Sequence, residues 1–417
     1  MRKIILFFLI SSIAIAQPLT LDECYKLAYN HSPLTKNGLN YKLIKDKKIL
    51  NADAGYYPDF NISAQAKYQS DVLQLPIKLP TISIPEIPKE NYQVVLNINQ
   101  VVWDGYAISS QREIAEKQFD LDNSNIEIEL YKLRERINLA YFGIISLNSR
   151  MNLMVVTISD LNEKLKDLDS KIKNGIAMQS NADFLKSERI KLEATIFEIS
   201  SNINSFRTML SKLIGKEITA AQEIVLEDYP SVPEYNISNR KEFNAFKSSK
   251  DMINSSKNLI DAKYSPKVFA FAQAGYGKPG LNMFDPDFAP FWIVGLKASW
   301  NPWSWGNQDR EKEIIDVQGE LVKIQEENFK QNMEILSIND KNEIEKANNN
   351  LIMDDQIILL KRAILKTSEA KFDGGVMSAV DYFNDLTALR QAEMNKEIHK
   401  IDLVKYINSY KTTLGVK

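Results

Sequence analysis

The side chains that most often carry out catalysis are scarce in this sequence. Its 417 residues include one cysteine, Cys24, and two histidines, His31 and His399. One thiol can neither form an internal disulfide nor supply the ligand cluster of a zinc site. Cys24 falls on the apolar side of a helical pattern, and the sequence has no phosphate-binding glycine loop and no nucleophile elbow. We therefore expect no catalytic residue, no metal site and no cofactor, and we interpret Cys24 as a buried structural thiol.

The N-terminus has the pattern of a Sec-type signal peptide over residues 1–16. Arg2 and Lys3 are followed by an apolar stretch over 4–10 and by a small-residue cleavage site over 14–16. Such a segment is too short to span a membrane. No later run of about 18 apolar residues exists, which predicts that the mature chain has no transmembrane helix. The formal net charge of -2 offers no basic face for nucleic acid.

The sequence repeats itself with a period of roughly 200 residues. Residues 53–58 match 261–266, residues 64–68 match 272–276, and residues 96–103 match 296–303. We divide the chain into a first repeat (17–215), a linker (216–236) and a second repeat (237–417). The matches indicate an internal duplication, because the period is too long for a solenoid repeat.

Proline placement separates helical from extended segments. No proline lies between Pro88 and Pro230, and none follows Pro302. Because an interior proline costs a helix about 3 kcal/mol, both stretches are predicted to be mostly helical. The expected helices span residues 20–56, 106–173 and 180–214 in the first repeat, and 238–263, 307–373 and 379–414 in the second. The expected strands span residues 58–70, 91–103, 266–277 and 291–302. The predicted fold is mainly α with a small β part.

Apolar residues in the first repeat step by three and four along two helices. One series runs from Met151 to Ile172 and the other from Leu192 to Leu213. This spacing predicts an antiparallel coiled-coil hairpin that reverses at Gly175. In the second repeat, Asn348–Asn350 interrupt the series, so we expect those helices to pack more loosely.

The four predicted strands alternate apolar and polar residues, and each has about the length that crosses a tilted bilayer. The strand near 268–276 is less regular, because Phe269 and Phe271 fall on its polar side. Aromatic residues gather at the strand ends, as in the girdles of a membrane barrel facing outer-membrane lipid. One girdle is Tyr68, Tyr92, Tyr276 and Trp292, and the other is Phe60, Trp103, Trp300 and Trp303. A soluble four-stranded sheet packed on helices is the alternative.

Four strands cannot cross a membrane as an open sheet, because lipid offers no partners for the N–H and C=O groups at its edges. The smallest common barrels have about eight strands. Several copies of the chain must therefore share one barrel, whose strand number is a multiple of four.

Taken together, these features resemble the TolC family of outer-membrane efflux proteins over nearly the whole mature chain. The resemblance is carried by Leu19–Glu23, Tyr57-Pro58, Asn99–Gly105, the glycine-then-aspartate spacing at both hairpin tips, and the Leu-x-Gly that ends each repeat. It implies a homotrimer with a twelve-stranded barrel in the outer membrane and a helical coiled-coil tunnel in the periplasm. It places the linker in an equatorial region, and it implies a periplasmic adaptor (membrane fusion protein) and an inner-membrane pump as partners.

The resemblance also implies a gate at the second hairpin tip, where family members carry aspartates. Asp381 matches the first aspartate, Asn384 replaces the second, and Asp385 is adjacent. Three copies of Asp381 would form an acidic constriction that favours cations. Asp183, at a tip with two extra residues, is the expected counterpart in the first repeat. A helix N-terminal carboxylate is the alternative interpretation of Asp381.

Two other tip features follow from the same resemblance. The tyrosine and arginine that lock the family's tip fall on Phe372 and Met377, which cannot make those polar links. The adaptor is expected to dock at Gly175, Gly374 and Gly375, where side chains are small.

The sequence therefore predicts a passive duct of a tripartite efflux pump or a type I secretion system. The alternative function is a periplasmic coiled-coil adaptor without a barrel. Neither the cargo nor the role of the proline-rich loop over 75–89 follows from the sequence.

Overall fold

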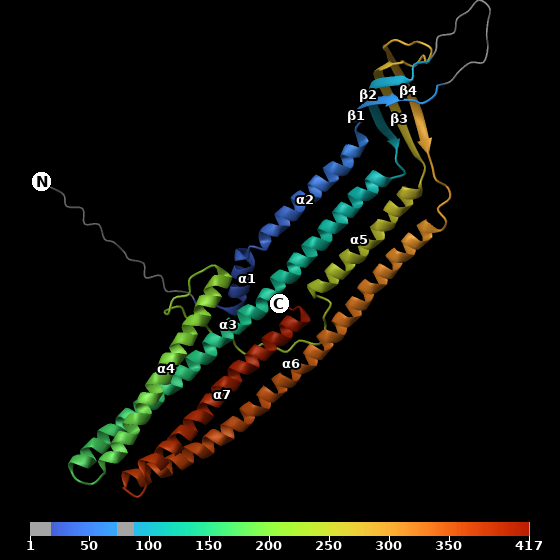
Figure 1. The fold of residues 1–417 in the computed structure, drawn as a ribbon. Helices are drawn as coiled ribbons and strands as arrows, with labels where there is room; N and C mark the ends of the chain where they lie inside the picture. The colour runs from blue at the N-terminus through green and yellow to red at the C-terminus, as the bar shows by residue number, and fades with distance from the viewer. Residues whose placement is uncertain (1–17, 73–86, 417) are drawn as a thin grey trace, which may run out of the picture. The chain divides into compact units, whose positions relative to one another are not determined.

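The computed structural model describes residues 18–72 and 87–416 (Figure 1). The predicted signal peptide and most of the proline-rich loop lie outside these residues. The chain divides into two compact units. Unit 1 comprises Met1–Lys36, Ile126–Phe243 and Asn328–Lys417, and unit 2 comprises Asn37–Asn125 and Asn244–Glu327. The units do not coincide with the two sequence repeats, because each takes segments from both.

Unit 2 contains a four-stranded antiparallel sheet with the order β1-β2-β3-β4. Its strands are β1 (Asp59–Tyr68), β2 (Glu90–Trp103), β3 (Lys267–Lys278) and β4 (Ala289–Ser299). Most of α2 (Thr35–Asp53), the 3-10 helix η1 (Ala54–Tyr56), most of α5 (Lys241–Tyr264) and the first turns of α3 and α6 complete the unit. The sheet is thus an up-and-down meander with β1 and β4 at its edges.

Unit 1 is helical. It contains α1 (Leu21–His31), α4 (Gln179–Ile214), α7 (Ala379–Leu414) and the rest of α3 (Ala107–Lys173) and α6 (Asn307–Asp373). Both α3 and α6 have 67 residues, and both α4 and α7 have 36. The bounds of the second pair follow those of the first at a constant offset of 200 residues. The mainly α fold class with a small antiparallel sheet is confirmed, and the equal lengths fit a duplicated unit.

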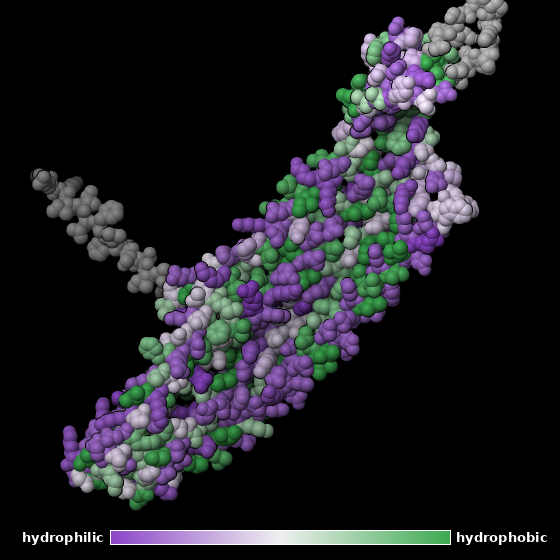
Figure 2. All heavy atoms as spheres, in the orientation of Figure 1, coloured by the Kyte–Doolittle hydropathy of each residue, from purple (hydrophilic) through white to green (hydrophobic). Residues whose placement is uncertain are grey.

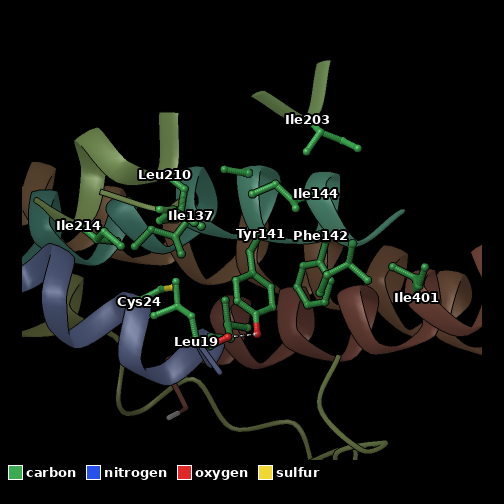
Figure 3. Close-up of a cluster of buried hydrophobic side chains, with 14 of the residues drawn as sticks. Leu19, Cys24, Ile137, Tyr141, Phe142, Ile144, Ile203, Leu210, Ile214 and Ile401 are labelled. Atoms are coloured by element: carbon green, nitrogen blue, oxygen red, sulfur yellow. Dashed lines mark hydrogen bonds between the residues drawn. The ribbon is translucent and has the colours of Figure 1, made fainter. Parts of the chain in front are cut away.

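An apolar core in unit 1 joins α1, α3 and α4 (Figure 3). Ile137, Tyr141 and Ile144 of α3 are almost fully buried against Leu210 and Ile214 of α4. The Tyr141 hydroxyl lies 3.0 Å from the carbonyl oxygen of Leu19 and 2.6 Å from that of Val225. These hydrogen bonds tie the start of the mature chain and the inter-repeat linker to the long helix.

Cys24 lies in this core with none of its surface exposed, as the sequence indicated. Burial raises the pKa of the Cys24 thiol to about 12. A thiol that stays protonated is a poor nucleophile, so the structure supports a packing role.

The predicted single helix over 20–56 is wrong. α1 ends at His31, α2 begins at Thr35, and a 3-10 turn follows α2. Pro33 explains the first break, because a proline disfavours the helical conformation of the residue before it. Ser32 accordingly has a ψ of 128° and caps α1, its N–H donating to the carbonyl of Ala28.

The sequence predicts no transmembrane helix. By length and composition, α3 is long and apolar enough to cross a membrane. No other helix among the described residues meets this criterion. A core helix passes the same test, and residues 137–145 of α3 contribute several side chains to the core described above.

Candidate functional site

The strand register places most of the apolar side chains of the four strands on one side of the sheet. Phe60 lies opposite Ile98, Val94 opposite Tyr276, and Ala274 opposite Trp292. We define the apolar face by the following residues: Phe60, Ile62, Ala64, Ala66, Tyr68, Tyr92, Val94, Leu96, Ile98, Ala270, Ala272, Ala274, Tyr276, Trp292, Val294, Leu296 and Ala298.

This apolar face is the more exposed face of the sheet. In β4, Trp292, Val294 and Leu296 are 71%, 64% and 76% exposed, whereas their neighbours Phe291 and Ile293 on the other face are half-buried. A sheet that packs on a water-soluble core buries its apolar side. This sheet instead leaves its apolar face exposed, an arrangement that we call inside-out.

Aromatic side chains bound the apolar face at both ends. At the loop end, Phe288 stacks between Tyr92 and Tyr276, with ring centroids 6.5 Å and 5.6 Å away. At the helix end, Trp303 meets Trp305 edge to face, and the Trp300 Nε1 donates to the carbonyl of Tyr264 at 3.2 Å. All eight aromatic residues expected from the sequence are at least 40% exposed. Phe288 and Trp305 were missed, because each lies just outside the predicted strand.

We define the polar face by the side chains that alternate with the apolar ones. Asn97 bridges two strands on this face, since it accepts from the Gln273 Nε2 at 2.8 Å and donates to the Ser63 Oγ at 3.2 Å. The polar face comprises Asp59, Asn61, Ser63, Gln65 and Lys67; Asn91, Gln93, Val95, Asn97, Asn99 and Val101; Lys267, Phe269, Phe271, Gln273, Gly275 and Gly277; and Ala289, Phe291, Ile293, Gly295, Lys297 and Ser299.

Cross-strand glycines explain why phenylalanines interrupt the polar pattern of β3. Phe271 lies opposite Gly295, and Gly275 lies opposite Phe291. A Cβ at Gly295 would lie 2.8 Å from the Phe271 ring, and one at Gly275 would collide with the Phe291 ring. Each ring therefore covers a glycine of the neighbouring strand, which shields exposed backbone. The sequence shows the irregularity, but the explanation needs the register.

Both sheet edges are open within the described chain. All ten residues of β1 are exposed. Consecutive strands alternate in direction, so β4 of one copy can pair antiparallel with β1 of another. Open edges with unpaired backbone groups call for such a partner.

The long helices also leave apolar side chains at the surface, and on the face in view these lie among hydrophilic ones (Figure 2). Within α6, Val317, Leu321 and Ile324 are each more than half exposed, and they follow the four-then-three spacing of a helix-packing seam. This row offers a surface for another helix.

The two hairpin tips of unit 1 have the same backbone construction. Gly175 and Gly375 have φ of 72° and 75°, which favours glycine. The N–H of Gly175 donates to Ile172 and that of Ile176 donates to Lys171, and the second tip repeats both bonds. This is the Schellman ending of a helix. A Cβ on either of these glycines would meet nothing within 4 Å, so both turns are open to a partner.

The side chains after these glycines are apolar and exposed. Ile176, Met178 and Val376 are 70%, 74% and 79% exposed. For adaptor docking, the sequence interpretation named only Gly175, Gly374 and Gly375. The missed signal was the apolar residue that directly follows the last glycine of each turn, Ile176 in the first turn and Val376 in the second.

The position of Asp183 is a correction. Each helix pair is joined by five residues, 174–178 and 374–378, so the first tip has no extra residues. Asp381 is the third residue of α7, and the third residue of α4 is Asn181. Asp183 lies two residues further along its helix and is not the counterpart of Asp381.

The acidic residues of the second tip point in different directions. Asp381 and Asn384 are both exposed, and a spacing of three residues puts them on one face of α7. Ser378 caps the helix, since its Oγ accepts from the Asp381 N–H at 3.1 Å and donates to the Asp381 carboxylate at 2.6 Å. Asp385 accepts from the Ser368 Oγ at 2.6 Å and is thereby held toward α6.

Ion pairs join the two hairpins close to the tips. The Lys164 Nζ of α3 lies 2.7 Å from Glu369 and 3.3 Å from Asp373 of α6. Arg390 of α7 lies 2.5 Å from Asp160 of α3. Partial burial lowers the pKa of Lys164, but hydrogen bonds to its two carboxylates outweigh that effect and raise the pKa above its ordinary value. We name Lys164, Asp160, Glu369, Asp373 and Arg390 the tip clamp.

The two residues that fall where the family has a polar lock lie in the apolar tip core. Phe372 is buried and stacks on Tyr382 at 4.9 Å between ring centroids. Met377 packs against the same cluster. The charged contacts of the tip clamp lie beside this core instead.

Comparison with known proteins finds similarity in structure and none in sequence. No family model matches the sequence, and no curated protein matches it. Among solved structures, CusC, described as forming a transmembrane channel, has a TM-score of 0.73 at 11% identity and covers 97% of this chain and 94% of its own. The outer-membrane protein VceC of Vibrio cholerae has a TM-score of 0.68 at 13% identity, with coverages of 95% and 96%. The chain has the TolC-family outer-membrane-channel fold.

The open state of MtrE, an outer-membrane channel of Neisseria gonorrhoeae, shares the fold as well. Its TM-score is 0.65 at 14% identity, with 95% of this chain and 89% of that chain covered. The resemblance inferred from sequence is therefore confirmed for the fold. Within the TolC-family fold, the described residues contain no group of three histidine, cysteine or acidic side chains placed to hold a metal ion.

Proposed function

We propose that the chain is one of three copies of a passive duct in the outer membrane. The three sheets would join into one twelve-stranded barrel, and the long helices would form a tunnel in the periplasm. The observation that carries this proposal is the inside-out sheet, whose apolar face is exposed and bounded by aromatic side chains at both ends. Lipid is the solvent in which such a face is stable.

The open edges support the sharing of a barrel between copies. Lipid offers no hydrogen-bond partners to the N–H and C=O groups at the sheet edges. β4 of each copy would therefore pair with β1 of the next. The exposed apolar row on α6 would pack against helices of a neighbouring copy. Energy for export would come from an inner-membrane pump, in an efflux or a type I secretion assembly.

The alternative, a periplasmic adaptor without a barrel, accounts for the helical hairpins alone. It does not explain why Trp292, Val294 and Leu296 are exposed, because in an adaptor they would face water. Exposed apolar patches of this kind mark membrane or protein contacts. The duct is the better supported function.

The hairpin tips would form the periplasmic entrance. Asp381 and Asn384 would face the constriction, and the exposed Ile176 and Val376, together with the adjoining glycines, would dock the periplasmic adaptor. The tip clamp holds the two hairpins together in this structure. An adaptor that prefers separated hairpins would shift the population toward an open entrance.

Membrane assembly tests the duct. Wild-type protein should resist carbonate extraction from membranes, whereas Leu296→Arg should be released. An arginine on the lipid side of a barrel costs about 2–4 kcal/mol at the midplane, and three copies share the cost. The matched control is Gln273→Arg on the polar face, which should remain membrane-bound. Extraction of the wild type, or equal behaviour of the two variants, would contradict the proposal.

Planar bilayers test the gate. The purified protein should give stable single-channel currents that divalent cations block from the periplasmic side. Asp381→Ala should weaken that block about tenfold or more, because a ring of three carboxylates is removed. Asp183→Ala serves as the control and should leave the block unchanged. Unchanged block in Asp381→Ala would remove Asp381 from the entrance.

A further inference from the structure

The polar face of the sheet carries unpaired positive charge. Lys67, Lys267 and Lys297 alternate with apolar-face residues in β1, β3 and β4. Among the described residues, none of these three ammonium groups has an ion pair or a hydrogen bond to a side chain. One carboxylate, Asp59, lies on the same face. Three lysines against one aspartate leave the face net positive.

Aromatic rings lie beside two of these lysines. Lys297 of β4 is directly opposite Phe269 of β3, and Lys267 lies two residues before Phe269 in β3. Phe271 lies two residues after Phe269 in β3. Phe271 is supported by Gly295 of the next strand, so its ring lies close against the sheet. Amide groups of Asn97 and Gln273 continue the face toward the loop end. A flat ring carrying an acidic group could stack on the phenylalanines while its charge meets an ammonium group.

We infer that the polar face forms a passage wall that binds and favours aromatic organic anions. The inference rests on the proposed function, which turns this face toward the interior of the barrel. Three copies would then repeat the lysines and phenylalanines around one lumen. Rings of lysine or arginine select anions in pores, because they raise the local anion concentration.

The exit wall would therefore differ in charge from the entrance. Asp381 makes the tip acidic, whereas the sheet contributes lysines. A probe that enters from the loop side of the barrel tests the wall without crossing the tip.

The experiment compares two planar ions of opposite charge in bilayers. Pyrenetetrasulfonate, an aromatic anion, and ethidium, an aromatic cation, are added to the chamber that faces the strand loops. Wild-type current should be blocked at lower concentration by pyrenetetrasulfonate. The double variant Lys267→Gln and Lys297→Gln should raise its half-blocking concentration about fivefold or more, with ethidium block not weakened. The control Lys278→Gln, whose register position is on the other face of β3, should change neither.

A second variant separates the ring from the charge. Phe269→Leu should weaken block by pyrenetetrasulfonate but leave block by citrate unchanged, because citrate carries charge without a ring. Stronger block by ethidium than by pyrenetetrasulfonate in the wild type would overturn the inference while the duct stands. Unchanged block in the double-lysine variant would do the same. Absence of any stable conductance would overturn the proposed function and this inference with it.

Discussion

At the residue scale, glycines with positive φ fix where the helices end. Gly215 follows α4 with φ of 70°, and a Cβ there would collide with the His31 ring of α1. Gly175 has nearly the same φ, but its Cβ would stand in open space. An alanine at either position would therefore be strained in its backbone, but only at Gly215 would it also overlap a neighbouring side chain.

Alanine at these two glycines should separate strain from overlap. Gly175→Ala should cost about 1 kcal/mol from the left-handed conformation alone. Gly215→Ala should cost about 3 kcal/mol, because the His31 ring must also move. Thermal unfolding followed by circular dichroism measures both, and the larger loss should belong to Gly215→Ala. Equal losses would show that α1 does not pack against this end of α4.

The buried thiol gives a pH-dependent prediction. The pKa of Cys24 is about 12 in the folded chain and near 9 when unfolded. Between these values the unfolded state has released a proton that the folded state retains, so stability falls as pH rises above about 9. Cys24→Ala should remove up to about 1.4 kcal/mol per pH unit from this slope. Chemical denaturation between pH 8 and 10 measures the slope, and an identical slope in both proteins would contradict burial of the thiol.

At the element scale, periodicity predicted much of the fold and missed what depends on contacts. The alternation in residues 58–70 and 91–103 indicated two amphipathic strands, and the structure pairs them from Asp59 with Asn99 to Tyr68 with Glu90. The break at Ser32 was readable from Pro33. The pairing of Phe271 with Gly295 was not, because strand register depends on the neighbouring strand. The tip clamp could not be predicted either, because its partners are far apart in sequence. Lys164 and Asp373 are 209 residues apart, and Arg390 and Asp160 are 230 residues apart.

The ion pairs of the tip clamp should make it harder for the two hairpins to separate. Lys164→Ala combined with Arg390→Ala removes the ion pairs of the tip clamp, each worth about 1 kcal/mol or less when partly exposed, and leaves the contact of Lys171 with Asp373. The double variant should show larger and more frequent open-channel currents in bilayers. Lys191→Ala, which breaks only the pair with Glu188 inside α4, should behave like the wild type. Wild-type currents in the double variant would mean that the tip clamp does not keep the entrance closed.

At the scale of the whole molecule, the proposed duct requires more than one copy of the chain. Its sheet has two open edges, its apolar face is exposed, and its long helices carry unpartnered apolar rows. The sequence predicts that several copies are needed, because the edge N–H and C=O groups of a four-stranded sheet have no partners in lipid. That argument gives only a multiple of four strands. The number three follows from the resemblance to the TolC family.

The most direct test of the account is the number of chains in the assembled particle. Native mass spectrometry of protein extracted from membranes in mild detergent should give a mass of three mature chains. Leu296→Arg should abolish this species and Gln273→Arg should retain it. A water-soluble monomer that needs no detergent would contradict the account, because its apolar sheet face would then be stable in water without a neighbour.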